Sequence, residues 1–380
     1  MGPVVAVVGG GQLARMMAAP AAALKINLRV LVEAEDGAAA QVLTDTPVGA
    51  ADDEAAVTQI TTGADVLTFE HEHVPHRILA NLQQAGVAVR PGPAALRAAQ
   101  DKIHMRERLS ELGVPCPRWA AVDSVAALQA FGDEVGWPVV LKRPVGGYDG
   151  KGVRLIKTAA EGADWVEGPD AASQGALAEE NVDFRSELAA LLARRPTGQM
   201  AHWATVQTVQ VDGMCSEVIS PAPDLDAERS ARAEQIAATI AQGLDVTGVL
   251  AVEMFHTADG HLLVNELAMR PHNSGHVTIE AHTTSQFEQH LRAVLDLPLG
   301  PTDQGPRWAV MANVLGSELT DPTTVYPEVL ATYPQAKVHL YGKSVRPRRK
   351  LGHVTVTGED LTSARQTARA AADMLEGRRR

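Results

Sequence analysis

Cysteine is nearly absent from the 380-residue sequence, which contains only Cys116 and Cys215. The two do not stand in the spacing of a metal-ligand or redox pair, so we interpret both as packing residues and expect a reducing, cytoplasmic location. Long apolar runs are also missing, and no cationic leader precedes the first strand pattern at residues 4–8. Neither secretion nor insertion into a membrane is therefore expected.

Positive charge is the second shortage. The chain has 34 Lys and Arg against 46 Asp and Glu, for a formal net charge of −12. Non-specific binding to nucleic acid requires a basic surface, so no nucleic-acid partner is expected. An acidic protein that binds phosphates must gather its cations locally, and clusters of Lys and Arg are therefore informative. With 45% hydrophobic and 21% charged residues the chain has the composition of an ordinary globular protein.

The length predicts two or three packed units, and the pattern divides at residues 100 and 300. Residues 1–100 alternate apolar strands (4–8, 28–32, 64–69 and 87–89) with helical patterns, which predicts a parallel α/β unit. Pro91-Gly92-Pro93 marks its candidate boundary. Residues 301–380 contain short strand patterns at 309–314, 337–341 and 353–356 and a final amphipathic helix, which predicts a small third unit.

The middle unit, residues 101–300, has a mixed α+β pattern, with a lid subdomain at about 118–187. We predict helices at 102–112, around Glu187–Leu192 and at 227–242. Strands are predicted at 138–142, 153–156 and around 205–211, followed by a hairpin of residues 249–255 and 262–266.

A first glycine-rich turn, Gly9-x-Gly11-x-x-Ala14, follows a strand and opens a helix, which is the context of a phosphate-binding turn. Glu33 lies 22 residues beyond Gly11, where a dinucleotide-binding domain places its ribose-binding carboxylate. The literal interpretation is NAD binding. The alternatives are a turn that only lets the helix pack against the sheet, or one that binds another phosphate.

A second glycine-rich segment, Gly146 to Gly152, connects two predicted strands. Four glycines in seven residues let backbone N–H groups approach phosphate oxygens, and Lys151 adds a charge at the tip. Lys142 ends the preceding strand and Lys102 begins a helix on the other side of the proposed cleft. We predict a loop that covers the phosphates of ATP. A surface hairpin is the alternative.

The predicted hairpin carries two carboxylates. Glu253 and Glu266 interrupt apolar strands, and a loop at Thr257–Gly260 would place Glu253 opposite Val264. Glu253 and Glu266 then become diagonal neighbours on one face and can share a divalent ion, for which hard oxygen ligands and nucleotide phosphates favour Mg²⁺. Asn265 faces the other way unless the strand is irregular. Two solvated glutamates are the alternative.

Two further segments suit a phosphorylated second substrate. The constrained polar loop from Arg270 to His276 begins shortly after Glu266. The densest basic cluster, Lys343, Arg346, Arg348, Arg349 and Lys350, suits a ribose phosphate because arginine binds phosphate in bidentate geometry. Upstream, Ala176–Val182 offers a strand edge for an adenine, a weak signal taken alone.

The order Lys102, Lys142, glycine loop, Glu179…Val182…Glu187 and Glu253…Asn265-Glu266 resembles the ATP-grasp superfamily. Within it, four strings are similar to the N5-carboxyaminoimidazole ribonucleotide synthetase family. They lie at residues 9–16, 146–152, 265–276 and 341–353, so the resemblance covers nearly the whole chain. It implies an α/β and α+β molecule with an ATP-grasp fold, an N-terminal Rossmann-like (pre-ATP-grasp) domain and a small C-terminal domain.

The resemblance also implies a reaction in purine biosynthesis. ATP, bicarbonate and 5-aminoimidazole ribonucleotide give N5-carboxyaminoimidazole ribonucleotide, ADP and phosphate, with carboxyphosphate as the intermediate and Mg²⁺ (or Mn²⁺) as the metal. Because carboxyphosphate hydrolyses readily, the glycine loop should close over it as a lid. A homodimer is implied as well, and contact with the mutase that acts next in the pathway is possible.

The implied roles of individual residues fall into four groups. The catalytic group is Lys142, Lys102, Arg270, His272 and Lys151. ATP is bound by Lys102, Lys142, Gly147, Tyr148, Asp149, Gly150, Lys151, Gly152, Glu179, Glu180, Val182, Glu187, Asn265 and Glu266. The metal ligands are Glu253 and Glu266. The aminoimidazole ribonucleotide and bicarbonate are bound by Gly11, Gln12, Leu13, Glu70, Tyr148, Asp149, Arg270, His272, Asn273, Ser274, Lys343, Arg346 and Arg349.

The chain departs from the family pattern at several positions. Met269 stands where proline is usual, His73 where asparagine is usual, and Arg348 where glycine is usual. Arg348 therefore leaves open whether it, Arg346 or Arg349 meets the ribose phosphate. The alternatives that remain are another ATP-grasp ligase (a formate-using glycinamide ribonucleotide transformylase or a biotin carboxylase), an NAD-dependent oxidoreductase, and a non-catalytic nucleotide-binding regulator.

Overall fold

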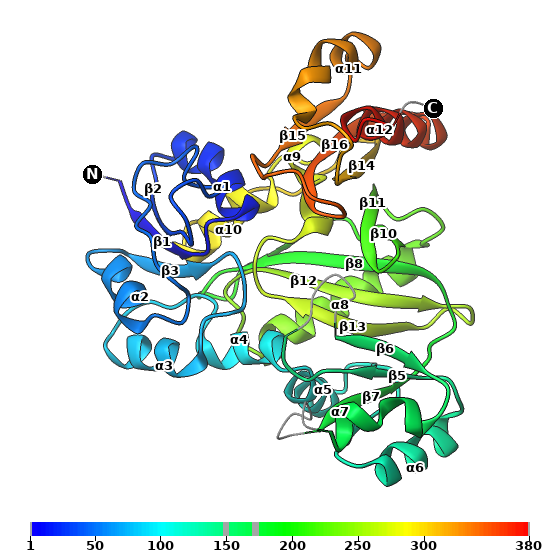
Figure 1. Cartoon of the computed structure of the whole chain (residues 1–380). Helices are drawn as coiled ribbons and strands as arrows, with labels where there is room; N and C mark the ends of the chain where they lie inside the picture. Colours follow the sequence, from blue (N-terminus) through cyan, green and yellow to red (C-terminus); the bar gives the residue numbers. More distant parts are fainter. Residues whose placement is uncertain (1, 147–151, 169–174, 379–380) are drawn as a thin grey trace.

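The computed structural model describes residues 2–146, 152–168 and 175–378 (Figure 1). The N-terminal part is a parallel sheet in the order β2-β1-β3, and β1 and β3 are nearly fully buried and almost entirely apolar. The parallel α/β prediction for this part is therefore confirmed. Its elements are β1 (Val4–Val8), α1 (Gln12–Ala23), β2 (Asn27–Leu31), α2 (Glu54–Thr61), β3 (Val66–Phe69) and α3 (His76–Gln84).

The prediction of a strand at residues 87–89 is wrong. Only Val89 pairs, in an isolated parallel bridge with Leu67. Pro91, which has no N–H to donate, follows two residues later and the next helix begins at Pro93, so the ladder cannot extend.

Two helices, α4 (Pro93–Gln100) and α5 (Lys102–Glu111), lead from the N-terminal part to the rest of the molecule. Asp101 separates them and caps α5, since its Oδ1 accepts from the backbone N–H groups of Ile103 and His104 at 3.0 and 3.1 Å. Such a cap satisfies N–H groups that a helix start leaves unpaired. It fixes Lys102 in the first turn of α5, as the sequence predicts.

A four-stranded antiparallel sheet in the order β4-β7-β5-β6 follows. Leu128 and Phe131 of the helix α6 cover one face and join Val139 and Leu141 in a separate core. Figure 1 shows this small sheet and its helices below the large sheet of the molecule. Its elements are β4 (Trp119–Val122), α6 (Val125–Val135), β5 (Val139–Lys142), β6 (Val153–Ile156), α7 (Ala163–Val166) and β7 (Ala176–Glu180).

The largest sheet has the order β13-β12-β8-β10-β11-β14-β16-β15, with β9 paired to β8. Its described strands are β8 (Phe184–Arg194), β9 (Met200–His202), β10 (Val206–Val211), β11 (Met214–Ser220), β12 (Gly248–Thr257), β13 (Leu262–Ala268), β14 (Trp308–Leu315), β15 (Lys337–Leu340) and β16 (Lys350–Gly358). The helices beside it are α8 (Ala227–Gly243), α9 (Thr278–Ala281), α10 (Gln286–Val294), α11 (Tyr326–Thr332) and α12 (Leu361–Leu375).

The helix predicted around Glu187–Leu192 is wrong, because this segment lies in the strand β8 between β12 and β10. Residues 188–193 are all buried. A strand buried on both faces is apolar at every position, so leucines appear at helical spacing by coincidence. The long helix predicted at 227–242 is confirmed by α8.

The large sheet continues from the middle of the chain to its C-terminal part, because β14 pairs with β11 on one side and with β16 on the other. The helix α12 covers β14 and β16 with Ala364, Ala368, Ala371 and Leu375. On the other side of the molecule, Phe287 and Leu291 of α10 pack in one core with residues of the N-terminal sheet and α1. Within the described ranges, no helix has the length and apolarity of a membrane span.

Candidate active site

The hairpin of β12 and β13 brings two carboxylates together, but in a different register from the predicted one. Glu253 pairs directly with Glu266, while Met254 pairs with Val264, so the predicted pairing of Glu253 with Val264 is wrong. The shift lies between Glu253 and Met254 and makes Asn265 the extra residue of a β-bulge. Directly opposed side chains lie closer than diagonal ones, so the bulge tightens the carboxylate pair.

Asn265 uses the bulge to join the site. Its Oδ1 accepts from Nζ of Lys142 at 2.8 Å, and its backbone carbonyl accepts from the guanidinium of Arg106 at 2.8 Å. A regular strand would turn this side chain to the opposite face. The strand irregularity that Asn265 needs in order to reach the site is therefore present as the β-bulge.

A third carboxylate, Glu187, lies on the same face of the sheet. Glu253 pairs with Ala189 of β8, and Glu187 stands two residues away from Ala189. Burial raises the pKa of Glu187 to about 7. Burial, followed by the charges of Glu266 and Glu187, raises the pKa of Glu253 to about 7 as well. Clustered carboxylates with raised pKa values fit a divalent cation, and hard oxygen ligands of this kind suit Mg²⁺.

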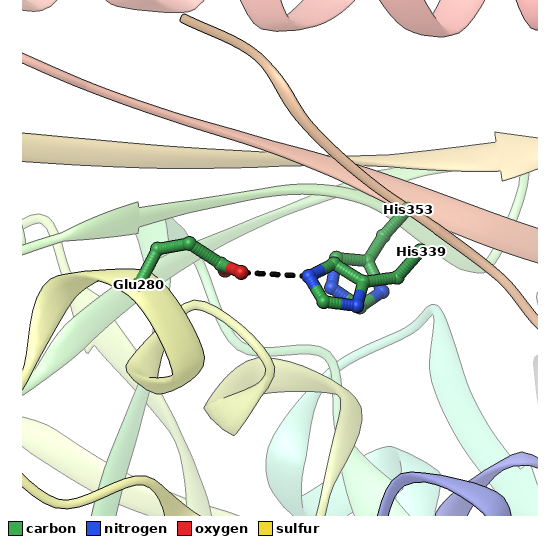
Figure 2. Close-up of side chains that lie close together, drawn as sticks. All are labelled: Glu280, His339 and His353. Carbon is green, nitrogen blue, oxygen red and sulfur yellow. Dashed lines mark hydrogen bonds and ion pairs between the residues drawn. The ribbon is translucent and has the colours of Figure 1, made fainter. Parts of the chain in front are cut away.

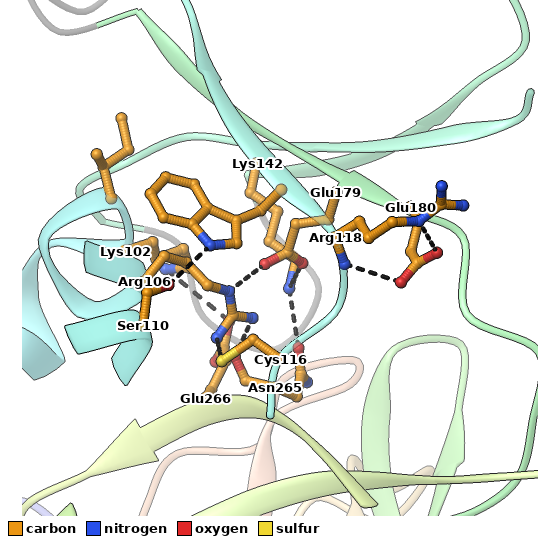
Figure 3. A network of polar contacts seen from close by, with 12 residues as sticks. Lys102, Arg106, Ser110, Cys116, Arg118, Lys142, Glu179, Glu180, Asn265 and Glu266 are labelled. Atoms are coloured by element: carbon orange, nitrogen blue, oxygen red, sulfur yellow. Dashed lines mark hydrogen bonds and ion pairs between the residues drawn. The ribbon is translucent and has the colours of Figure 1, made fainter. Parts of the chain in front are cut away.

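Beside these carboxylates lies a buried ion-pair network centred on Glu179 (Figure 3). Its carboxylate accepts from Nε of Arg106 at 2.6 Å and from Nζ of Lys142 at 2.8 Å, and its side chain is only 2% exposed. Burial opposes ionisation of Glu179, but the charges of Arg106 and Lys142 outweigh it and lower the pKa. The network fixes the Lys142 ammonium between β5, α5 and the hairpin.

The other residues of this region that were predicted to bind ATP lie around the Glu179 ion-pair network. Glu180 binds Arg118, accepting from its backbone N–H at 2.8 Å and from its Nε at 2.9 Å. Val182 is half-buried in the connection from β7 to β8. Lys102 lies 3.9 Å from Glu266 and donates from Nζ to the carbonyl of Gly146 at 3.2 Å.

Gly146 and Gly152 frame the predicted phosphate-covering loop. The backbone N–H of Arg143 donates to the carbonyl of Gly152 at 2.9 Å, so both loop ends return to the end of β5. The start of α5 therefore contacts both the loop entrance and the carboxylate hairpin. Gly147, Tyr148, Asp149, Gly150 and Lys151, to which nucleotide or substrate roles were assigned, lie outside the described residues.

The polar loop after β13 packs against the carboxylates. The Nε2 of His272 lies 3.4 Å from Glu253, and its Nδ1 is 2.8 Å from the hydroxyl of Ser274. Burial, with the charges of Arg270 and Lys350, lowers the pKa of His272 to about 3, so it is a neutral imidazole. Arg270 is held by Glu72 at 2.9 Å. The Nδ2 of Asn273 is buried and lies beside the thiol of Cys215.

The first glycine-rich turn is filled by a carboxylate. Glu70, at the carboxyl end of β3, accepts from the backbone N–H of Ala14 at 3.1 Å, in the first turn of α1. A Cβ on Gly11 would lie 1.9 Å from Oε1 of Glu70, so only glycine fits. The position where a dinucleotide fold holds a pyrophosphate is therefore occupied by the protein's own anion, which argues against the NAD interpretation. Leu13 is buried behind this turn.

The C-terminal basic segment, residues 343–350, reaches this turn. Lys343 donates from Nζ to Gln12, and the carbonyl of Gly342 accepts from Gln41 at 2.8 Å. Arg348 turns away and donates to the carbonyl of Asp212 at 2.8 Å, while Arg349 donates to the carbonyl of Ser344 at 3.2 Å. The side chain of Arg346 is exposed.

Sequence reasoning missed three residues of the site. Arg106 binds Glu179, Glu72 holds Arg270, and Gln286 accepts from the backbone N–H of His272 at 2.8 Å. The signal for Arg106 is its position four residues after Lys102, on the same face of α5. Glu72 and Gln286 are distant in sequence from their partners, so only the fold shows their contacts.

Three family models match successive parts of the chain. The ribonucleotide synthetase preATP-grasp domain matches residues 3–100, the ATP-grasp domain residues 107–287, and the phosphoribosylaminoimidazole carboxylase C-terminal domain residues 309–367.

Curated relatives match over almost the full length. The N5-carboxyaminoimidazole ribonucleotide synthase of Mycobacterium tuberculosis is 50% identical, covering 98% of this chain and 88% of its own, and that of Corynebacterium ammoniagenes is 46% identical, with coverage of 98% and 92%. Among solved structures, the Thermus thermophilus synthetase has a TM-score of 0.87 at 35% identity, with 98% of both chains covered. The Aspergillus clavatus enzyme, solved with ADP and 5-aminoimidazole ribonucleotide, has a TM-score of 0.89 at 30% identity, with 99% of both chains covered.

Proposed function

The chain belongs to the N5-carboxyaminoimidazole ribonucleotide synthase family of ATP-grasp ligases, and from this premise we propose how its site carries out the reaction. The reaction is the ATP-dependent carboxylation of 5-aminoimidazole ribonucleotide in purine biosynthesis. We further propose that bicarbonate supplies the carboxyl group, that carboxyphosphate is the intermediate and that ADP and phosphate are released.

The observation that carries this proposal is the meeting of fixed cations and clustered carboxylates between α5, β5 and the β12–β13 hairpin. Lys142 is held by Glu179 and Asn265, each at 2.8 Å, and Lys102 lies beside Glu266. Phosphoryl transfer needs positioning and neutralisation of charge more than covalent catalysis. An ammonium group held in place by a buried partner, as Lys142 is by Glu179, supplies both without reorganisation during the reaction.

The carboxylates have the donor chemistry for the metal that accompanies the nucleotide. Glu253 and Glu266 would hold Mg²⁺, with Mn²⁺ as a substitute. Burial and then the charges of Glu266 and Glu187 raise the pKa of Glu253, and a bound cation would offset both effects. When bound, the ion neutralises charge on the phosphate oxygens. The neutral His272 then orients Glu253 through its Nε2 and links the carboxylate pair to the substrate loop.

The second substrate lies between the polar loop and the basic segment. We assign its phosphate to Lys343, Arg346 and Arg349, and its ring and the bicarbonate to Glu70, Arg270, His272, Asn273 and Ser274, with Gly11 and Gln12 at the adjoining turn. Tyr148 and Asp149 are assigned from the family resemblance alone.

The proposal is tested by measuring ADP release with aminoimidazole ribonucleotide, bicarbonate or the metal omitted in turn. We expect each omission to remove product formation, and Mn²⁺ to restore activity in place of Mg²⁺. The substitution Glu266→Gln should abolish turnover, whereas Glu228→Gln, an exposed residue of α8, should leave it unchanged. A requirement for formate instead of bicarbonate, or an active Glu266→Gln enzyme, would overturn the respective assignment.

Quaternary structure and location are proposals that rest on the family resemblance. We propose a homodimer in the cytoplasm, which sedimentation equilibrium of the purified protein would check through its mass. We also propose contact with the mutase that consumes the product, which co-sedimentation of the two enzymes would test.

A further inference from the structure

Three metal-ligating side chains meet outside the nucleotide site, where α9 packs against the edge of the large sheet (Figure 2). Glu280 belongs to α9, and His339 and His353 are cross-strand partners in β15 and β16. One ligand atom from each lies within 4.8 Å of the other two. The two imidazole rings stack with centroids 4.6 Å apart, and Oε1 of Glu280 is 2.6 Å from Nε2 of His339.

The cluster leaves buried polar atoms unsatisfied. Among the described residues, Oε2 of Glu280 and Nε2 of His353 have no hydrogen-bond partner, and the same is true of Nε2 of the adjacent His276. His353 and His276 are fully buried, with ring centroids 5.1 Å apart. A buried polar atom without a partner is costly, so three in one place indicate a missing ligand.

The tautomer and charge of His353 suit metal binding. Its Nδ1 lies 2.7 Å from the hydroxyl of Tyr341, which can accept a hydrogen bond from Nδ1–H and so leave the lone pair on Nε2. Burial lowers the pKa of both His353 and His276 well below the ordinary range, so both are neutral imidazoles. Metal ions bind the neutral form of histidine.

We propose that Glu280, His339 and His353 form a binding site for a divalent transition-metal ion of the zinc type. Two imidazole nitrogens and one carboxylate oxygen are a common donor set for Zn²⁺, whereas Mg²⁺ prefers oxygen ligands alone. The direct Glu280–His339 contact requires the carboxylate to rotate and present Oε2 to the ion, and the stacked rings to tilt toward it. The fourth ligand is water or Nε2 of His276.

The position of this site gives the ion a structural role. It joins α9, which follows the substrate loop at residues 270–276, to β15 and β16, which flank the basic segment at 343–350. The ion would therefore fix the distance between the two segments that we assign to the second substrate. The side chain of His339 is 30% exposed and that of Glu280 is 14% exposed, so the ion can enter from solvent.

The test measures Zn²⁺ and Co²⁺ binding to the metal-stripped full-length protein by equilibrium dialysis and visible absorption. Excess Mg²⁺ and ADP keep the carboxylates of the nucleotide site occupied. We expect one equivalent to bind, and His339→Gln and Glu280→Gln each to weaken binding by more than about 100-fold, since even outer-shell partners of a metal contribute 10–100-fold. The matched control is His76→Gln, which removes an exposed histidine at the start of α3 and should bind normally.

X-ray absorption of the Zn²⁺-loaded wild-type protein keeps the test valid if a variant does not fold. Two imidazoles and at least one oxygen around zinc support the site. Absence of stoichiometric binding, a zinc shell without imidazole, or unchanged binding by both folded variants would overturn it. A zinc-induced rise in Tm that is lost in His339→Gln but kept in His76→Gln would add a readout independent of activity.

Discussion

At the scale of single residues, the site depends on charges that are buried in pairs. Glu179 is held by Arg106 and Lys142, and removal of either cation leaves a buried charge without its full compensation. Breaking a buried ion pair in this way is strongly destabilising, whereas exposed pairs contribute little. The contrast can be measured, because Arg118 and Glu180 form an exposed pair on the same small sheet.

We predict that Arg106→Met destabilises the protein by about 3–5 kcal/mol, because Glu179 stays buried with Lys142 as its only cation. Turnover should also fall, since Lys142 is then drawn further toward Glu179. The control Arg118→Met removes an arginine whose side chain is 54% exposed and should cost less than about 1 kcal/mol. Urea unfolding curves of both variants measure the difference, and equal losses would contradict the prediction.

Arg348 provides a second prediction at this scale. Its φ of +61° lies in the left-handed region that favours glycine, and its side chain reaches Asp212 rather than the polar loop. Arg348→Gly relieves about 1 kcal/mol of backbone strain and loses a surface contact of similar size, so stability should hardly change.

The kinetic outcome separates Arg348 from Arg346. The KM for aminoimidazole ribonucleotide should stay within about twofold in Arg348→Gly and rise at least about tenfold in Arg346→Ala, since a phosphate contact contributes roughly 1.5–3 kcal/mol. Steady-state kinetics with saturating ATP measure both values. A large KM increase in Arg348→Gly alone would reassign the phosphate to Arg348.

At the scale of elements, regular periodicity was predictable and irregularity was not. The helices α5 and α8 and the N-terminal parallel strands follow from apolar spacing and caps. The bulge at Asn265 has no local signature, and the Lys142 partner of Asn265 lies 123 residues away. Strand β8 was misread for a related reason, since its neighbours β10 and β12 bury both faces and erase the alternation that marks a strand.

In the candidate site, too, some residues were predictable from the sequence and others were not. Lys102, Lys142, Glu253 and Glu266 were identified from residue type and order, and the structure brings them together around the hairpin. Arg106 looked like an ordinary helix residue, and its burial depends on β7 and β13. Roles that depend on partners from distant strands cannot be derived from local pattern alone.

The bulge leads to a prediction for Asn265→Ala. This change removes the acceptor that holds Lys142 at 2.8 Å but keeps the backbone carbonyl that binds Arg106. We expect kcat to fall by about 10–100-fold, since a displaced phosphate-binding group lowers the rate strongly, while Tm changes little. Asn265→Asp, which keeps an acceptor, should recover part of the loss. A large fall in Tm, with no recovery of kcat in Asn265→Asp, would indicate a merely structural role.

At the scale of the whole molecule, residues from both ends of the chain build one site. Gln12 and Lys343 are in contact although 331 positions separate them, and α10 packs between the N-terminal sheet and the large sheet. His290 of α10 links the two sheets directly. Its Nδ1 accepts from the backbone N–H of Val249 at 3.1 Å, and its Nε2 lies 2.9 Å from the hydroxyl of Thr68.

This bridge fixes the protonation state of His290. Because Val249 donates to Nδ1, the proton lies on Nε2 and points to Thr68. Burial lowers the pKa of His290 to about 3 in the folded protein, against about 6.5 when the chain is unfolded. The unfolded state therefore binds the extra proton between these two values. Stability from this group is complete above pH 6.5 and is lost as the pH falls toward 3.

We expect the free energy of unfolding of the wild type to fall with acid by about 1.4 kcal/mol per pH unit below 6.5 from His290 alone. Other buried histidines add to the total slope, so the informative quantity is the difference from His290→Gln, which lacks the titrating group. That variant should be less stable at pH 7.5 but should lose stability more slowly between pH 6.5 and 5. Exposed His76→Gln should keep the wild-type slope. Urea unfolding at several pH values measures all three slopes, and an unchanged slope in His290→Gln would mean that the bridge tolerates a protonated imidazole.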